Sequence, residues 1–103
     1  MTATVKHIVM WKVSGDSSAE RAAHCERVKR EFESLRGRVP GLLGLEVGID
    51  RSGVDYACDV VLCSEFASHA ALEAYATHPE HLRVKAALGN LRKARHQVDY
   101  LNE

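Results

Sequence analysis

Alternating apolar and polar residues near the start of the chain predict a β-strand over residues 4–13. One face of this strand would carry Val5, His7, Val9, Trp11 and Val13, and the other Lys6, Ile8, Met10 and Lys12. Both faces hold large apolar side chains at mid-strand, whereas a sheet covered on one side only has a more polar second face. We therefore expect this strand to be covered on both sides.

A helix is expected after the turn at residues 14–16. Ser17 and Glu20 fit a capping box, which places the helix from there to about Leu35. Its apolar stripe has helical spacing and consists of Ala22, Cys25, Val28, Phe32 and Leu35. Cys25 falls within the stripe, so we interpret it as a core residue and not as a nucleophile. Gly37 is suited to a left-handed C-cap.

Two further strands are predicted over residues 43–50 and 56–66, joined by a hairpin turn at residues 50–53. Asp59 interrupts the second, otherwise apolar run. A carboxylate in such a position is costly unless it is paired. We therefore expect Asp59 to accept a structural hydrogen bond or to form an ion pair at a subunit interface.

The second helical region is predicted to be broken. Ser68 is a suitable N-cap for a helix through Tyr75, and proline at position 79 should bend the chain at His78. A second segment then runs to about Arg92, with an apolar stripe of His81, Val84, Leu88 and Leu91. Lys85, Arg92 and Lys93 lie off this stripe and are interpreted as solvated charge, and a last strand is expected over residues 95–101.

The resulting order of elements is the ferredoxin-like β-α-β-β-α-β pattern, an α+β fold with a four-stranded antiparallel sheet and helices on one face. We expect one domain over residues 1–103. The helix-free face would carry the apolar residues Ile8, Met10, Val61 and Cys63. Because large apolar patches on a sheet mark interfaces, we expect a homodimer paired through these faces.

Composition excludes several functions. Lys and Arg together number 14, as do Asp and Glu, so bulk charge favours neither nucleic acid nor an anionic membrane as a partner. No apolar run approaches the roughly 20 residues of a transmembrane helix. The opening Met1–His7 segment lacks a signal-peptide layout. Three cysteines are best explained as free thiols in a reducing compartment, which predicts a cytoplasmic location.

The residues with candidate chemistry cluster at the predicted helix bend. Tyr75, His78 and His81 place a phenol and two imidazoles around a proline, where they could line the mouth of a pocket. They could equally be buried structural groups, since His and Tyr are often partly buried. A metal site is not expected, because the bend breaks the helical register of the two histidines and no third ligand lies nearby.

The sequence resembles the stress-responsive dimeric α/β-barrel (Dabb) family along nearly its whole length. The matching segments are Val5-Lys6-His7-Ile8-Val9, Val39-Pro40-Gly41, Leu45-Glu46-Val47-Gly48, Asp59-Val60-Val61-Leu62, Phe66, the Tyr75/His78-Pro79/His81 block and Val98-Asp99-Tyr100. The resemblance implies a ferredoxin-like homodimer in which the two sheets form a barrel.

Within this family the chain is distantly similar to the plant olivetolic acid cyclase, which closes a polyketide chain by a cofactor-free aldol condensation. The resemblance implies that His81 is a general base, that Tyr75 polarises or positions a substrate carbonyl, and that His7 orients the substrate. His78, Trp11 and Phe66 are further candidate substrate-binding residues. The chain has Val60 where the cyclase has another pocket histidine, which implies a less polar pocket wall and a different substrate.

Two functions follow as hypotheses. The first is a cofactor-free cyclase or isomerase that acts on a small carbonyl or polyketide-like compound, with an apolar, phenolic or carbonyl ligand in its pocket. The alternative is a non-catalytic, stress-associated dimer with a ligand-binding or structural role, in which the histidines are satisfied core groups.

Overall fold

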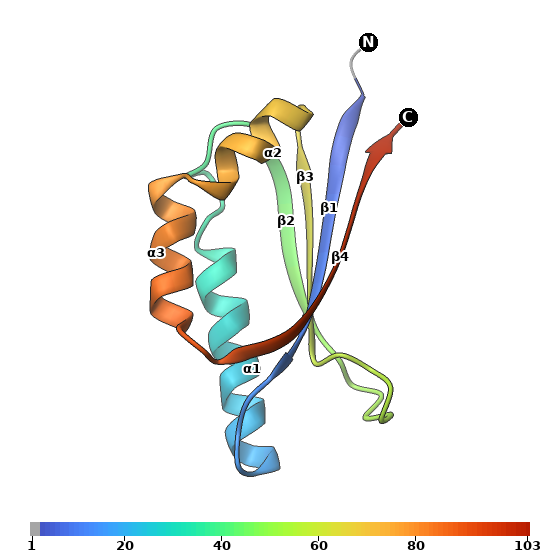
Figure 1. Ribbon diagram of the computed structural model, residues 1–103, viewed down its shortest axis with the longest axis vertical. Helices are drawn as coiled ribbons and strands as arrows, with labels where there is room; N and C mark the ends of the chain where they lie inside the picture. The colour runs from blue at the N-terminus through green and yellow to red at the C-terminus, as the bar shows by residue number, and fades with distance from the viewer. Residues whose placement is uncertain (1–2) are drawn as a thin grey trace.

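The computed structural model describes residues 3–103; Met1 and Thr2, which the sequence analysis includes in the single domain and in the opening segment, lie outside the described residues. Seven elements follow one another along the chain (Figure 1): β1 (Thr4–Val13), α1 (Ser18–Glu33), β2 (Leu42–Ile49), β3 (Val60–Phe66), α2 (His69–Ala76), α3 (Pro79–Leu88) and β4 (Arg92–Asn102). None of the helices in this range is long and apolar enough to cross a membrane.

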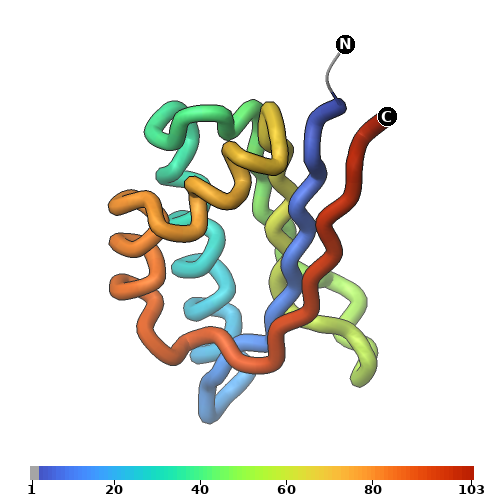
Figure 2. Tube along the Cα trace, turned by 45° about the horizontal axis from the view of Figure 1, so that its top comes forward, coloured from blue at the N-terminus to red at the C-terminus, as the bar shows by residue number. Residues whose placement is uncertain are grey.

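The four strands form one antiparallel sheet in the order β2-β3-β1-β4, which confirms the predicted ferredoxin-like arrangement. All three helices lie on the same side of this sheet (Figure 1, Figure 2). The central strand β1 is paired on both edges, with β3 and with β4. Its alternating side chains therefore face two different environments.

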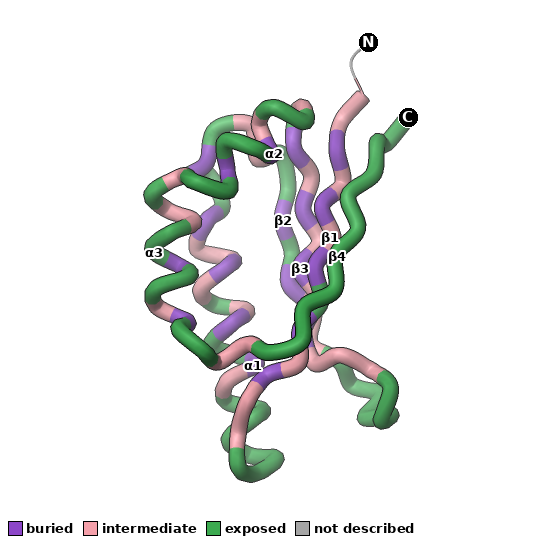
Figure 3. Tube along the Cα trace, viewed as in Figure 1, coloured by how far each residue is buried: buried purple, intermediate pink, exposed green. Residues whose placement is uncertain are grey.

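The core lies between the helices and the sheet (Figure 3). The five residues predicted for the inward face of β1 are all buried there, which confirms the alternation. In α1 the side chains of Cys25, Val28 and Phe32 are buried, but Ala22, predicted to begin the stripe, is exposed because the first turns of α1 extend past the sheet (Figure 1). The predicted core role of Cys25 is thus confirmed.

Helix α1 begins as predicted but ends earlier. The Ser17 hydroxyl accepts a hydrogen bond from the Glu20 backbone N–H (3.0 Å), and the Glu20 carboxylate accepts one from the Asp16 N–H (3.2 Å). The last helical residue is Glu33, and turns follow it. Gly37 has a φ of 76°, so it is left-handed as expected, although it lies in these turns and not at the cap.

Strand β3 begins at Val60, four residues later than predicted, and the prediction of a strand from Tyr56 was wrong. Residues 50–59 form a loop in which the Asp50 carboxylate accepts hydrogen bonds from the Ser52 hydroxyl and the Gly53 N–H. Tyr56 in this loop is 87% exposed. These bonds close a turn at residues 50–53, and the apolar run that follows joins the sheet only from Val60.

Asp59 has the structural role that the sequence suggested. One carboxylate oxygen accepts a hydrogen bond of 2.8 Å from the backbone N–H of Val13. The Asp59 backbone N–H donates to the Trp11 carbonyl, also at 2.8 Å. The carboxylate therefore fastens the end of the loop to β1.

The break between α2 and α3 occurs at His78 and Pro79, as predicted. His78 is the N-cap of α3, and its Nδ1 accepts a hydrogen bond of 3.1 Å from the Glu80 N–H. Helix α3 ends at Leu88, before the predicted Arg92, because Gly89 leaves the helical conformation with a φ of 53°.

Strand β4 begins at Arg92, three residues earlier than predicted, and contains a bulge. Arg95 pairs with Trp11 and Lys93 pairs with Lys12, so Ala94 is the extra residue. Ala94 has a φ of 49°, a left-handed conformation that is unfavourable for a residue with a Cβ. A bulge with strained backbone beside a cavity is often associated with function.

Candidate functional site

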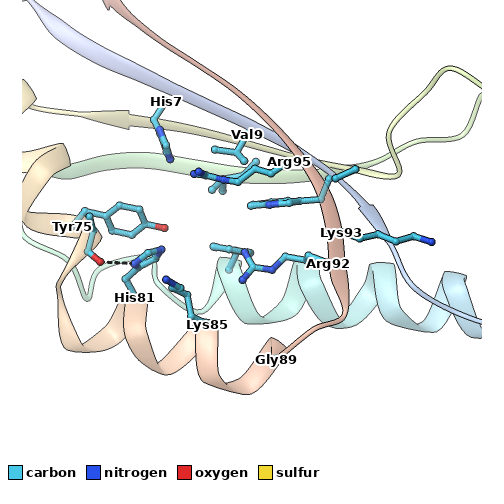
Figure 4. A pocket seen from close by; sticks show the side chains of 14 residues that line it. His7, Val9, Tyr75, His81, Lys85, Gly89, Arg92, Lys93 and Arg95 are labelled. Atoms are coloured by element: carbon cyan, nitrogen blue, oxygen red, sulfur yellow. Dashed lines mark hydrogen bonds between the residues drawn. The ribbon is translucent and has the colours of Figure 1, made fainter.

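A cavity of about 460 Å³ lies between the α2–α3 pair and the β1–β4 side of the sheet (Figure 4). Its floor is apolar and its walls carry imidazole, phenol and cationic groups. The lining residues are His7, Val9, Trp11, Phe32, Leu62, Tyr75, Ala76, His81, Lys85, Gly89, Arg92, Lys93, Ala94 and Arg95.

Tyr75 and His81 are neighbours in this cavity, as their positions around the bend suggested. The two rings lie 4.3 Å apart between centroids, with an angle of 45° between their planes. Tyr75, in the last turn of α2, is only 4% exposed, and its hydroxyl is directed into the cavity (Figure 4). His81, in the first turn of α3, is half-buried.

The hydrogen bond of His81 determines which ring nitrogen is free. Nδ1 lies 3.0 Å from the carbonyl oxygen of Ala76. A carbonyl can only accept, so Nδ1 carries the proton in neutral His81 and Nε2 keeps its lone pair. Nε2 is directed toward the interior of the cavity (Figure 4). His81 is thus oriented as a base.

Burial and charge keep His81 neutral. Desolvation lowers the pKa of His81 below its ordinary value, and the positive charges of Lys85 and Arg92 lower this pKa further, against the opposing effect of the Ala76 carbonyl. Histidine ordinarily titrates near about 6.5. The imidazole is therefore mainly unprotonated at neutral pH.

The Tyr75 hydroxyl remains a hydrogen-bond donor. Burial raises the pKa of Tyr75 to about 12, although Arg92 and Arg95 act in the opposite direction. A phenol with this pKa does not ionise near neutral pH. It can therefore donate a hydrogen bond to an oxygen that gains negative charge.

His7 reaches the cavity from β1 on the opposite side from His81 (Figure 4). Its Nδ1 donates a hydrogen bond of 2.6 Å to a carboxylate oxygen of Asp99, its cross-strand partner on β4. The other carboxylate oxygen of Asp99 accepts a hydrogen bond of 2.9 Å from the Gln97 side chain. Because Nδ1 is engaged, Nε2 of His7 is the nitrogen available to a ligand.

The remaining candidates from the sequence take different places. Trp11 lines the cavity, stacked on Phe32 at 5.1 Å between ring centroids. Phe66 is fully buried behind Tyr75, with ring centroids 5.0 Å apart, and does not line the cavity. His78 is also outside the lining, where its Nδ1 is occupied as the N-cap of α3.

Four cationic residues line the cavity that the sequence reasoning did not assign to the site: Lys85, Arg92, Lys93 and Arg95. Arg92 is not a solvated charge as predicted. It is half-buried, and its guanidinium carbon lies 5.0 Å from the centroid of the Trp11 ring. The concentration of three cations in four residues, at positions 92–95, was the available signal.

The residues present do not form a metal centre. Across residues 3–103, no group of three or more His, Cys, Asp and Glu side chains is arranged to hold a metal ion. The two histidines of the cavity have their Nδ1 atoms bound to protein acceptors. The Nε2 atom of His81, which is directed into the cavity, is free to accept a proton.

Fold and site together define a small ferredoxin-like domain with a base-containing cavity under its helices. Residues 5–102 match the family model of the stress responsive A/B barrel domain, Dabb. The chain belongs to this family, which confirms the resemblance in its sequence. No curated protein matches the chain.

Solved structures agree with this assignment. A dimeric ferredoxin-like protein of unknown function from Bacteroides fragilis is 30% identical, with a TM-score of 0.83 and 95% of each chain covered. A Dabb family protein from Mesorhizobium loti is 18% identical, with a TM-score of 0.76 and 99% of each chain covered. The hydroxynitrile lyase from Passiflora edulis is 15% identical, with a TM-score of 0.78 and coverage of 97% of this chain and 94% of that one.

Proposed function

We propose that the protein is a cofactor-independent enzyme of the cyclase or isomerase type, which removes an acidic C–H proton from a small carbonyl or polyketide-like compound. The observation that carries this proposal is the orientation of His81. Its Nε2 is unprotonated and directed into the cavity, and the centroids of the His81 and Tyr75 rings lie 4.3 Å apart. A positioned base of this kind typically contributes about 10²–10⁴-fold to a rate.

The reaction would begin when Nε2 of His81 takes a proton from a carbon flanked by two carbonyl groups. The electron pair of the C–H bond moves onto a carbonyl oxygen, which becomes an enolate oxygen. The Tyr75 hydroxyl donates a hydrogen bond to this oxygen and stabilises its charge. His81, now protonated, holds the proton for the second step.

The second step depends on the substrate. In an isomerisation, His81 returns the proton to a different carbon of the delocalised anion. In a cyclisation, the nucleophilic carbon forms a bond to a second carbonyl carbon of the same chain, and the resulting alkoxide takes the proton from His81. The isomerisation and the cyclisation both begin and end with the same number of protons and electrons, so neither requires a redox cofactor.

His7 and the apolar floor would position the substrate. His7 has its Nδ1 bound to Asp99, so its ring orientation is fixed and Nε2 can contact a second carbonyl oxygen. Val9, Leu62 and Trp11 provide apolar contact area for an alkyl or aryl body. The Passiflora edulis neighbour is a hydroxynitrile lyase, so the fold is compatible with lyase chemistry.

Deuterium exchange into benzoylacetone, followed by NMR, tests the proposal without knowledge of the natural substrate. We expect the wild-type protein to accelerate exchange at the carbon between the two carbonyls, and His81→Gln to lower this rate by about 100-fold. His69→Gln is the matched control, because His69 on α2 is largely exposed and pairs with Glu73. Equal rates in all three proteins and in buffer would favour the non-catalytic alternative.

We also infer a homodimer formed through the helix-free face of the sheet. The Bacteroides fragilis relative is described as dimeric. In this chain Met10, Val98 and Tyr100 on that face are exposed, at 37%, 58% and 48%. Because the cavity lies on the helix side, this pairing leaves it accessible. Light scattering should give twice the mass of one chain, and Val98→Lys should shift the mass toward one chain.

We also infer a cytoplasmic location and a role in a stress response. Cys25, Cys58 and Cys63 are free thiols, which supports a location in the reducing cytoplasm. The description of the family supports a role in a stress response. Expression and localisation of a tagged chain under stress would test both inferences.

A further inference from the structure

The bulge in β4 places two arginines on the same face of the sheet. Residues three apart on a regular strand point to opposite faces. Here the extra residue Ala94 changes the alternation, so that Arg95 pairs with Trp11 and Arg92 pairs with Val13. Both partners are buried on the helix side. Arg92 and Arg95 therefore both point into the cavity, as Figure 4 shows.

The Arg92 guanidinium lies against two aromatic rings. Its guanidinium carbon lies 5.0 Å from the Trp11 ring centroid and 5.4 Å from that of Phe32. Such stacking leaves the edge of the guanidinium plane free to donate hydrogen bonds. The Nε atom is buried and has no hydrogen-bond partner among the described residues. Buried donors without partners are rare in proteins and call for an explanation.

The four Lys and Arg side chains of this cavity form no ion pair with the described residues. None of the ion pairs found within residues 3–103 uses Lys85, Arg92, Lys93 or Arg95, and the one carboxylate that pairs with a cavity residue is Asp99, which is bound to His7. No Asp or Glu lines the cavity. Burial lowers the pKa of Arg92, and the positive charge of Arg95 lowers this pKa further. Two like charges brought together without a carboxylate favour an anion between them.

We propose that Arg92 and Arg95 form an oxyanion-binding subsite, which holds the carboxylate or phosphate group of a ligand whose apolar body lies on the cavity floor. Lys85 on α3 adds positive charge at the same cavity. Arginine is suited to bidentate contacts with either oxyanion. The protein has no formal net charge, so this selectivity is local to the cavity.

The subsite also specifies the substrate class of the proposed enzyme, and this step rests on the proposed function. Arg92 and Arg95 project from β4 toward the space that Tyr75 and His81 face (Figure 4). A ligand anchored by its oxyanion would present its carbonyl-bearing portion to His81. The substrate would then be an anionic carbonyl compound, such as an oxo acid with an apolar tail or a phosphorylated ketone.

Three ligands with the same para-butylphenyl body and different head groups separate charge from apolar contact. Calorimetry would compare para-butylbenzoate, its neutral amide and para-butylphenyl phosphate on the intact protein. We expect the wild type to bind the benzoate about tenfold or more tightly than the amide. A single charge-assisted hydrogen bond is strong enough to lower the dissociation constant by about this factor. If the phosphate binds more tightly than the benzoate, the subsite holds and its natural head group is a phosphate.

Variants assign this preference to the two arginines. Arg92→Met and Arg95→Met should each remove most of the preference for the charged ligands. Lys12→Met is the matched control, because it removes one positive charge from the neighbouring strand β1 at a residue that pairs with Lys93 but does not line the cavity. Equal binding of benzoate and amide, binding of none of the ligands, or an equal loss in Lys12→Met would overturn the proposal.

Salt dependence provides a test that needs no variant, in case Arg92→Met fails to fold. Affinity of the wild type for the benzoate should fall with added NaCl while affinity for the amide stays constant; parallel behaviour of the two would contradict the subsite. Benzoylacetone is neutral, so its exchange reports on the enzyme separately. Charge-selective binding without exchange would refute the enzyme alone, and exchange without charge selectivity would refute the subsite alone.

Discussion

His7 and Asp99 are cross-strand partners on β1 and β4, and the His7 Nδ1 lies 2.6 Å from the Asp99 carboxylate. His7 is 6% exposed, so this hydrogen bond forms near the boundary between the core and the cavity. Charge-assisted bonds of this kind are shorter and stronger than neutral ones. The pair therefore determines the orientation of the imidazole on the wall opposite His81.

Replacing Asp99 by Asn should leave the His7 imidazole less firmly oriented. We expect Asp99→Asn to lower the free energy of unfolding by about 1 kcal/mol, because a neutral amide replaces a charged acceptor. Nitrogen-15 NMR of the imidazole should show a mixture of the two neutral tautomers of His7 in place of one. A single unchanged tautomer would mean that Asp99 does not orient the ring.

The pKa of His81 gives a prediction about pH. Because burial lowers this pKa in the folded protein, exchange activity should be constant near neutral pH and should fall only below the ordinary histidine value of about 6.5. The unfolded chain takes up the proton first, so stability is lost as pH decreases from about 6.5 through the folded pKa. Thermal unfolding of wild type and His81→Gln should diverge in that range, with the wild type losing more stability toward acid.

The overall fold was readable from the sequence because burial follows periodicity. The alternation in β1, the capping serines Ser17 and Ser68, and the break at His78 all act locally, and each lies where predicted. The cationic wall was not readable in the same way. Whether Arg92 faces solvent or the cavity depends on the bulge at Ala94. That bulge arises from the register in which β4 pairs with β1, a strand about 80 residues earlier in the chain.

The bulge itself predicts an unusual response to glycine. Ala94 has a φ of 49°, where a Cβ costs roughly 1 kcal/mol and glycine carries no such penalty. We expect Ala94→Gly to keep or raise the melting temperature. Ala86→Gly on the exposed side of α3 should lower stability by about 1 kcal/mol. Similar losses in both variants, measured by chemical denaturation, would argue against the left-handed conformation at Ala94.

Two left-handed glycines should differ in their tolerance of a methyl group. Gly41 has a φ of 81°, and a Cβ there would lie 2.6 Å from the Cβ of Ala71 on α2. Gly37 has a φ of 76° and no atom within 4 Å of the same position. Both alanine variants incur the backbone penalty of roughly 1 kcal/mol, but Gly41→Ala also displaces α2. Urea denaturation should therefore show the larger loss for Gly41→Ala; an equal loss would show that α2 adapts freely.

The Asp59 carboxylate should contribute more to the free energy of unfolding than the carboxylate of Asp55 in the same loop. Asp59→Ala removes the acceptor of the Val13 N–H and should cost about 1–2 kcal/mol of stability. Asp55 is exposed in this loop, and Asp55→Ala should change stability by less than about 0.5 kcal/mol. Denaturant titrations of both variants would measure the difference, and a stable Asp59→Ala protein would contradict the fastening role.

The sequence indicated Tyr75 and His81 because a proline brings them together over a short distance. It did not indicate the Asp99–His7 pair, which joins residues 92 positions apart. Sequence reasoning therefore succeeds here for contacts within one corner and fails for contacts that only strand register creates. The candidate site combines both kinds.

The two faces of β1 have a consequence for mutational tolerance. Val5, Val9 and Val13 pack beneath the helices with 2% exposure or less, whereas the alternate residues contribute to the opposite face that we assign to a second chain. Ten consecutive positions are thus constrained, with no interval of freely variable residues. In a saturation library, β1 should tolerate the fewest substitutions of the four strands, and the exposed 50–59 loop should tolerate many more.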